Sequence, residues 1–147
     1  MKKKSVEILK YILPVILTSL LIVGLYIVIK GMPLMHVPDT EAIAYVEITN
    51  HRLNVTSKKF VEGEDIEMSR NLANLLLHKL GKAEKNQPII EIVYHLKNGE
   101  SMVLSTDEDT VFFNGHYYHL KDDNGKLFIK IVEGVFFFKE WVEESKY

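Results

Sequence analysis

The pattern of hydrophobic positions opens with an unbroken apolar run from Tyr11 to Ile29, in which no side chain carries a carboxylate, an amine or an imidazole. As an α-helix this run would be roughly 28 Å long, close to the hydrocarbon thickness of a bilayer. A buried helix of a soluble protein would instead show a polar face. The pattern therefore predicts a transmembrane anchor over residues 11–30.

Individual residues of this run also suit a membrane. Tyr11 and Tyr26 lie near its two ends, where amphipathic rings favour the membrane interface. Gly24 is well tolerated in lipid, and Pro14 comes early enough in the helix to introduce only a small kink. A cleavable signal peptide would have a shorter apolar region followed by small residues, whereas this run ends in Val28-Ile29-Lys30-Gly31-Met32-Pro33.

Charge predicts the orientation of the anchor. Five lysines and one acid give the first thirty residues a charge of +4, whereas the whole chain is −2, so residues 31–147 carry −6. Because most of these lysines precede the apolar run, the positive-inside rule predicts residues 1–10 in the cytoplasm and the C-terminal part outside. The acidic remainder argues against nucleic-acid binding. The sequence has no cysteine, which excludes disulfides and favours a bacterial envelope over a secreted eukaryotic domain.

Residues 31–41 contain Pro33 and Pro38, which favour extended backbone and resist continuation of the helix. We expect this segment to be a stalk between the anchor and a folded domain over residues 42–147. A length of about 100 residues is typical of one small domain. The sequence shows no internal repeat and no low-complexity segment.

The domain begins with strand patterns and continues with a helix. Residues 42–49 are rich in strand formers, and residues 52–57 form a weaker strand candidate. Ala44, Val46 and Ile48 would share one face of the first strand. An amphipathic helix is then predicted over Glu64–Leu80, with acids in its first turn, lysines near its end and Gly81 as its cap. Its apolar positions recur at helical spacing and indicate a core face: Ile66, Leu72, Ala73, Leu75, Leu76 and Leu80.

The second half of the domain reads as an antiparallel meander followed by a helix. Asn98-Gly99 and Asn114-Gly115 are strong hairpin signals, and they separate predicted strands over residues 89–96, 102–105, 110–113 and 116–120. Residues 127–138 fit both a helical stripe and a buried strand, and we favour the helix in spite of Gly134. The predicted fold class is α+β, with an antiparallel sheet packed against two helices.

Candidate chemistry in the domain is sparse. His95, His116 and His119 suggest a metal site or a small hydrolase, but His116 and His119 would point to opposite faces of a strand. Ser101 and Ser105 allow a Ser–His pair without a local signature. The acidic turns at residues 107–109 and 122–125 lack the spacing of a calcium loop and suit local hydrogen bonding. Glu62 and Asp65 belong at a helix N-terminus. We therefore assign no catalytic residue, no metal and no cofactor, and expect no enzyme.

The chain ends in a concentration of aromatic residues, which allows two interpretations. These residues close the core of the domain, or they form an exposed surface that meets a partner or contacts the bilayer a second time, because aromatic side chains are enriched both in cores and in interfaces. The residues concerned are Phe136, Phe137, Phe138 and Trp141.

The layout as a whole resembles small single-span proteins of Gram-positive bacteria with an extracytoplasmic domain of unknown function. The resemblance rests on the Lys-rich start, the Met32–Asp39 segment, the acid-initiated helix, the Asn98-Gly99 hairpin and the Tyr118–Leu127 stretch. It implies no catalytic residue. We expect a non-enzymatic protein, anchored in the bilayer through residues 11–30, whose domain binds an envelope protein or a ligand. The alternative is the histidine-using hydrolase or metal-binding domain.

Overall fold

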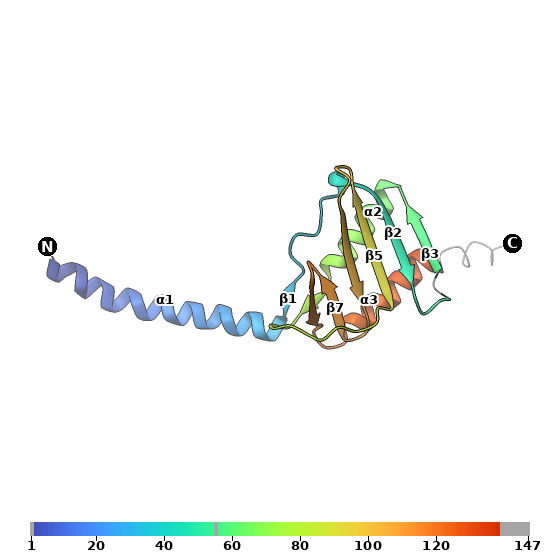
Figure 1. Cartoon of the computed structure of the whole chain (residues 1–147). Helices are drawn as coiled ribbons and strands as arrows, with labels where there is room; N and C mark the ends of the chain where they lie inside the picture. Colours follow the sequence, from blue (N-terminus) through green and yellow to red (C-terminus); the bar gives the residue numbers. More distant parts are fainter. Residues whose placement is uncertain (1, 55, 139–147) are drawn as a thin grey trace.

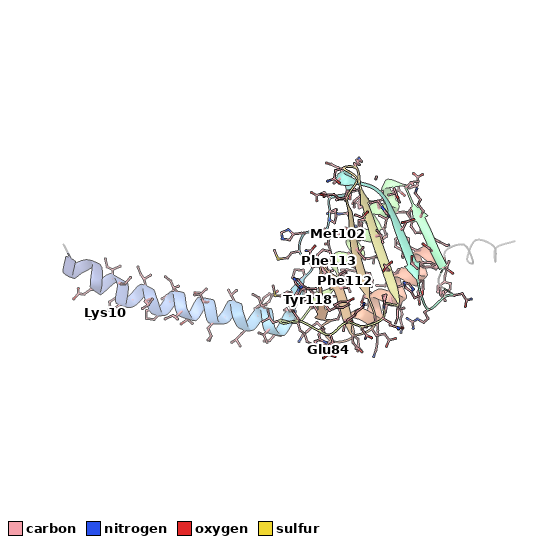
Figure 2. All side chains as sticks on the ribbon, viewed as in Figure 1. Lys10, Glu84, Met102, Phe112, Phe113 and Tyr118 are labelled. Carbon is pink, nitrogen blue, oxygen red and sulfur yellow. The ribbon has the colours of Figure 1, made fainter. Side chains whose placement is uncertain are left out.

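The computed structural model describes residues 2–54 and 56–138. A long helix, α1 (Lys2–Lys30), extends away from a small domain that contains the remaining elements (Figure 1). The part of α1 from Glu7 to Lys30 is long and apolar enough to cross a membrane, and the domain buries none of it. From Glu7 onwards, side chains along α1 project into open space on all sides (Figure 2).

Polar residues inside α1 satisfy their hydroxyl groups within the helix. The Thr18 hydroxyl donates to the Pro14 carbonyl at 2.8 Å, and the Ser19 hydroxyl donates to the Val15 carbonyl at the same distance. These bonds run one turn back along the helix, where Pro14 supplies an accepting carbonyl. The apolar surface of α1 therefore carries no unsatisfied hydroxyl in this stretch.

The domain is built on one six-stranded sheet in which every neighbouring pair of strands is antiparallel. The strand order is β3-β2-β5-β6-β7-β8. The strands are β2 (Ile43–Asn50), β3 (Thr56–Phe60), β5 (Ile90–Leu96), β6 (Ser101–Thr106), β7 (Thr110–Phe113) and β8 (His116–His119). The predicted α+β class and the predicted meander, which corresponds to β5 to β8, are thus confirmed.

Both Asn-Gly sequences form hairpin turns, but of different types. Asn114 and Gly115 both have positive φ, 49° and 77°, as a two-residue type I′ turn requires. In the β5–β6 hairpin only Gly99 is left-handed, and its N–H donates to the Leu96 carbonyl at 3.0 Å. Four residues, Lys97 to Glu100, connect these two strands, and Asn98 stabilises the loop by accepting the Glu100 N–H at 3.0 Å.

Two helices cover one face of the sheet, α2 (Gly63–Asn74) and α3 (Asn124–Val132), and α3 continues as a π-helical turn, η2 (Glu133–Phe137) (Figure 1). The helical interpretation of residues 127–138 is therefore confirmed up to Phe137. The core lies between helices and sheet, where alternate residues of the central strands are buried: Val46, Ile48, Ile90, Ile92, Tyr94, Leu104 and Val111. Phe128, Ile129 and Val132 of α3 meet them.

The predicted helix over Glu64–Leu80 is too long, because α2 ends at Asn74. Leu77 and His78 instead form β4, which pairs with β1 (Met32–Pro33). The Asn124 side chain stabilises this change of direction, since it accepts the Leu77 N–H at 2.7 Å and donates to the Leu75 carbonyl at 3.0 Å. As a result Leu75 and Leu80 are exposed, although the helical stripe predicts them in the core.

Residues 31–41, predicted to be a stalk, pack along the domain. Met32 and Pro33 pair with β4, and Leu34 is buried in the core. Arg70 of α2 binds the far end of the segment, because its guanidinium donates to the Pro38 carbonyl, the Thr40 hydroxyl and the Asp39 carboxylate. The extended backbone is as expected, but it is held by pairing and by Arg70.

Two strand predictions need correction. The second strand occupies Thr56–Phe60, so it begins later than residues 52–57 indicate, because Asn50 turns the chain by accepting the N–H groups of Arg52 and Leu53. In β2 the register shifts between Ile43 and Tyr45, so that Ile43 is buried and Ala44 is exposed. Val46 and Ile48 share the core face as predicted.

Candidate functional site

The sheet has a second face that no helix covers, although Asn86 and Pro88 of the segment before β5 line a small pocket with Ser105, Phe112 and Tyr117 at one end of it. Asn50 donates to Glu133 of η2 at 3.0 Å and Tyr94 donates to the Ser69 carbonyl of α2 at 3.2 Å, so these side chains mark the helix-covered face. Because successive side chains of a strand point to opposite faces of the sheet, the residues next to Asn50 and Tyr94 point away from the helices. We call this second surface the open face: Tyr45, Glu47, Thr49, Lys59, Glu91, Val93, His95, Ser101, Val103, Ser105, Phe112 and Tyr117.

Strand register arranges the open face in rows. One row joins Lys59, Glu47, Val93 and Val103 across four strands. A second joins Thr49, Glu91, Ser105, Phe112 and Tyr117, and the last two rings lie 4.8 Å apart. The valines and the aromatic residues are partly exposed. The open face is therefore a mixed surface of apolar centres between polar side chains.

The third row, Tyr45-His95-Ser101, takes part in more side-chain contacts than the other two rows. The Ser101 hydroxyl lies 3.1 Å from His95 Nδ1, and His95 Nε2 lies 2.7 Å from Glu47 Oε2. With a proton on Nε2, Ser101 donates to the ring and the ring donates to the carboxylate. The imidazole is stacked on Tyr45 at 4.2 Å between ring centroids, which holds its orientation.

Lys59 completes this cluster from the neighbouring strand. Its ammonium group lies 3.9 Å from the centroid of the Tyr45 ring, and Lys59 is the cross-strand partner of Glu47. The strand order β3-β2-β5 places Lys59 and His95 on the two sides of Tyr45. A cation over an aromatic ring is attracted by the negative charge of the ring face. The cluster thus presents a cation, a carboxylate, an imidazole and a hydroxyl on one surface.

This cluster has the connectivity of a nucleophile, a base and an orienting carboxylate. The side chains are nevertheless accessible, since His95 is 24% and Glu47 is 42% exposed. Such a surface offers hydrogen bonds and a stacked ring to a ligand, and the Ser101 hydroxyl is exposed.

The other candidate histidines do not join His95. His116 is paired with Phe113 and His119 with Thr110, so they point to opposite faces of β8, as the sequence predicts. Tyr118 separates them and contacts His78 at 4.5 Å between ring centroids. In Figure 2, Tyr118 lies at the end of the sheet nearest α1. Within residues 2–54 and 56–138, no three His, Cys, Asp or Glu side chains are grouped so that they could hold a metal.

Asp107 and Asp123 of the acidic turns use their carboxylates locally, whereas Glu108 lies 3.8 Å from Arg52. Asp107 accepts the N–H groups of Asp109 and Thr110, both at 2.7 Å, and the Thr110 hydroxyl at 2.9 Å. Asp123 forms an ion pair with Lys126 at 3.4 Å. The hydrogen bonds of the turn thus explain why an aspartate occupies position 107. Glu62 and Asp65 lie at the start of α2, where acids stabilise the helix dipole.

The aromatic end of the chain contributes to the core. Phe136 and Phe137 are 4% and 6% exposed, and Phe136 packs edge-on against Phe60 at 4.8 Å between centroids. These two residues are therefore not accessible to a partner in this structure, whereas Phe138 is 39% exposed. Trp141 lies outside the described residues.

Sequence patterns do not single out Tyr45, Glu47 and Lys59, whereas Ser101 and His95 are candidates for a Ser–His pair. The signal in the sequence is the alternation of apolar and polar residues along each strand: Glu47 lies between the buried Val46 and Ile48, and His95 follows the buried Tyr94. Which of these side chains meet depends on the pairing of β2 with β5. No protein-family model, curated protein or solved structure matches the chain. The candidate site therefore rests on geometry.

Proposed function

We propose that this protein is a single-pass membrane protein whose extracytoplasmic domain binds an envelope protein through the open face of its sheet. The observation that carries the proposal is the sheet face that no helix covers, with the partly exposed Tyr45, Val93, His95 and Val103 at its centre. The proposal agrees with the resemblance to anchored domains of Gram-positive bacteria and assigns the binding role to particular residues.

The proposed anchor is α1. A helix that is apolar on all sides and extends away from its own domain has no protein surface to bury it, so lipid is the environment that suits it. The lysines that precede the apolar run favour a cytoplasmic N-terminus, which places the domain outside. Tyr11 and Tyr26 would lie towards the two interfaces.

The composition of the open face supports a protein partner. The cores of protein interfaces are enriched in aromatic residues, and polar residues surround them. Tyr45, Phe112 and Tyr117 supply the aromatic area, and Val93 and Val103 form an apolar centre between them. Lys59, Glu47 and His95 supply directional contacts.

Photocrosslinking in native membranes tests this proposal. A photoreactive amino acid at Val93 should form an adduct with one partner, and Val103→Asp should abolish that adduct, because a charge in the apolar centre would be desolvated on binding. The matched control places the same probe at Asn71, an exposed residue of α2 on the other side of the domain. The circular dichroism spectrum of Val103→Asp should match that of the wild type, which shows that a lost adduct is not a loss of folding. Equal adducts from both positions, or an undiminished adduct in Val103→Asp, would contradict the assignment of the open face.

The Ser101-His95-Glu47 chain favours a second candidate function, a small serine hydrolase. A fluorophosphonate would then form a bond between Ser101 Oγ and phosphorus, expel fluoride and transfer the serine proton to His95. Labelling should be lost in Ser101→Ala and His95→Gln and retained in Ser105→Ala. An unlabelled wild-type protein excludes this candidate and leaves the binding function unaffected.

A further inference from the structure

We infer that the end of the domain next to α1 is a docking surface for the anionic headgroups of the bilayer that α1 crosses. The inference rests on the proposed anchoring by α1. The feature concerned is an open hollow of about 910 Å³, lined by Ile29 and Lys30 at the end of α1 and by residues of the β8–α3 turn and α3. We call it the membrane-proximal hollow.

The connection between α1 and the domain keeps the hollow at the end of the helix. Met32 and Pro33 pair with β4 immediately after α1, and the Lys121 N–H donates to the Leu77 carbonyl at 2.8 Å. Gly31 has a φ of +82°, and a Cβ added there would lie 3.2 Å from the His78 carbonyl oxygen. Close packing and a turn that favours glycine thus hold the domain directly against the end of α1.

The charge of the hollow is opposite to that of the domain. Four lysines, Lys30, Lys121, Lys126 and Lys130, line it together with two acids, Asp122 and Asp123, which leaves a charge of +2. Residues 31–147 as a whole carry −6. Among the described residues, Lys126 is the one lysine of the four with an ion pair, to Asp123 at 3.4 Å. A local cationic surface on an acidic domain, located where a helix leaves the membrane, is complementary to anionic headgroups.

Apolar side chains beside the lysines suit the same surface. Leu127 lines the hollow and is 57% exposed, and Leu75, which is 56% exposed, lies with it along a shallow groove between α2 and α3. Leucine next to lysine is the combination found on protein surfaces that lie in the headgroup region, where the apolar chain enters the interface and the ammonium remains at the phosphates.

The test uses the full chain in vesicles of phosphatidylcholine with and without phosphatidylglycerol, together with a headgroup-attached quencher. Because the sequence has no cysteine, Leu127→Cys carries a single fluorescent probe, and exposed His51→Cys carries the same probe in the β2–β3 loop at the far end of the domain (Figure 1). Anionic lipid should increase quenching at position 127 and leave position 51 unchanged.

Lysine variants then test the assigned contacts. Each of Lys121→Gln, Lys126→Gln and Lys130→Gln should lower the ratio of docked to undocked domain by about fivefold at low salt, and raised salt should do the same. Lys97→Gln, in the β5–β6 hairpin, is the matched control and should have no effect. If quenching does not depend on the charge of the lipid or on these lysines, the inferred docking surface is wrong, whereas the proposed anchoring by α1 is unaffected. A protein that does not float with the vesicles overturns the anchoring itself.

Discussion

At the scale of single residues, Tyr94 joins the sheet to α2 through one hydroxyl group. Burial raises the pKa of its phenol well above the usual value of 10, and the hydroxyl donates to the Ser69 carbonyl at 3.2 Å. The folded state therefore keeps this proton at pH values where the unfolded chain releases it. The contribution to stability is complete below about pH 10 and is lost as the pH rises further.

This predicts a specific alkaline destabilisation. The free energy of unfolding, measured by urea denaturation, should fall above pH 10 in the wild type and fall less steeply in Tyr94→Phe, which has no ionisable hydroxyl. At neutral pH the same variant should lose about 1 kcal/mol with its hydrogen bond. Tyr117→Phe, on the open face, should keep the alkaline decline. Parallel pH profiles for wild type and Tyr94→Phe would show that this phenol does not carry the effect.

Gly125, in the first turn of α3, illustrates a steric requirement that the sequence alone does not reveal. A Cβ at this position would overlap the Glu108 carbonyl group and lie 2.7 Å from Leu120 Cδ1. Because backbone cannot yield as a flexible side chain does, Gly125→Ala should destabilise the domain by about 1–3 kcal/mol. Gly134→Ala is the matched control, since its Cβ would meet open space and should be neutral or slightly stabilising. Thermal denaturation distinguishes the two variants.

At the scale of elements, Asn124 links the end of α2 to the start of α3. Its side chain accepts one backbone N–H and donates to one carbonyl across the junction with β4. Asn124→Ala leaves both groups without their partner, so the free energy of unfolding should fall by about 1–3 kcal/mol. Asn124→Asp keeps the acceptor and loses the donor, so its loss should be smaller. Equal stability of all three proteins in urea denaturation would contradict this role.

The same junction explains why α2 is shorter than the predicted helix. The apolar stripe of α2 continues in sequence through Leu80, and local propensity contains no signal that stops it at Asn74. Pairing between β1 and β4, and the two bonds of Asn124, give the backbone of residues 75–78 partners that a helix would otherwise supply. Tertiary contacts decide the boundary because they satisfy the same polar groups.

At the scale of the whole molecule, orientation is the central prediction. In intact cells, a membrane-impermeant thiol reagent should label His51→Cys and should not label Ser5→Cys, because the lysine-rich N-terminus is expected in the cytoplasm. After permeabilisation both should react. Labelling of Ser5→Cys in intact cells would reverse the topology and move both proposed binding surfaces into the cytoplasm.

Features that depend on short-range patterns follow from the amino-acid sequence alone. The long apolar helix follows from an uninterrupted run of apolar residues, the meander follows from alternation and Asn-Gly turns, and the α+β class follows from the order of these patterns. Each needs only spacing between near neighbours, which a single chain displays directly.

Tertiary structure decided which distant residues meet. The contact of His95 with Ser101 requires the pairing of β5 with β6, and its contact with Glu47 requires the pairing of β5 with β2. A shift of one residue in either pairing would turn these side chains to the other face. The burial of Phe136 and Phe137 and the gathering of lysines beside α1 depend likewise on packing between segments far apart in sequence. Periodicity specifies which faces are polar, whereas register and packing specify which polar groups share a surface.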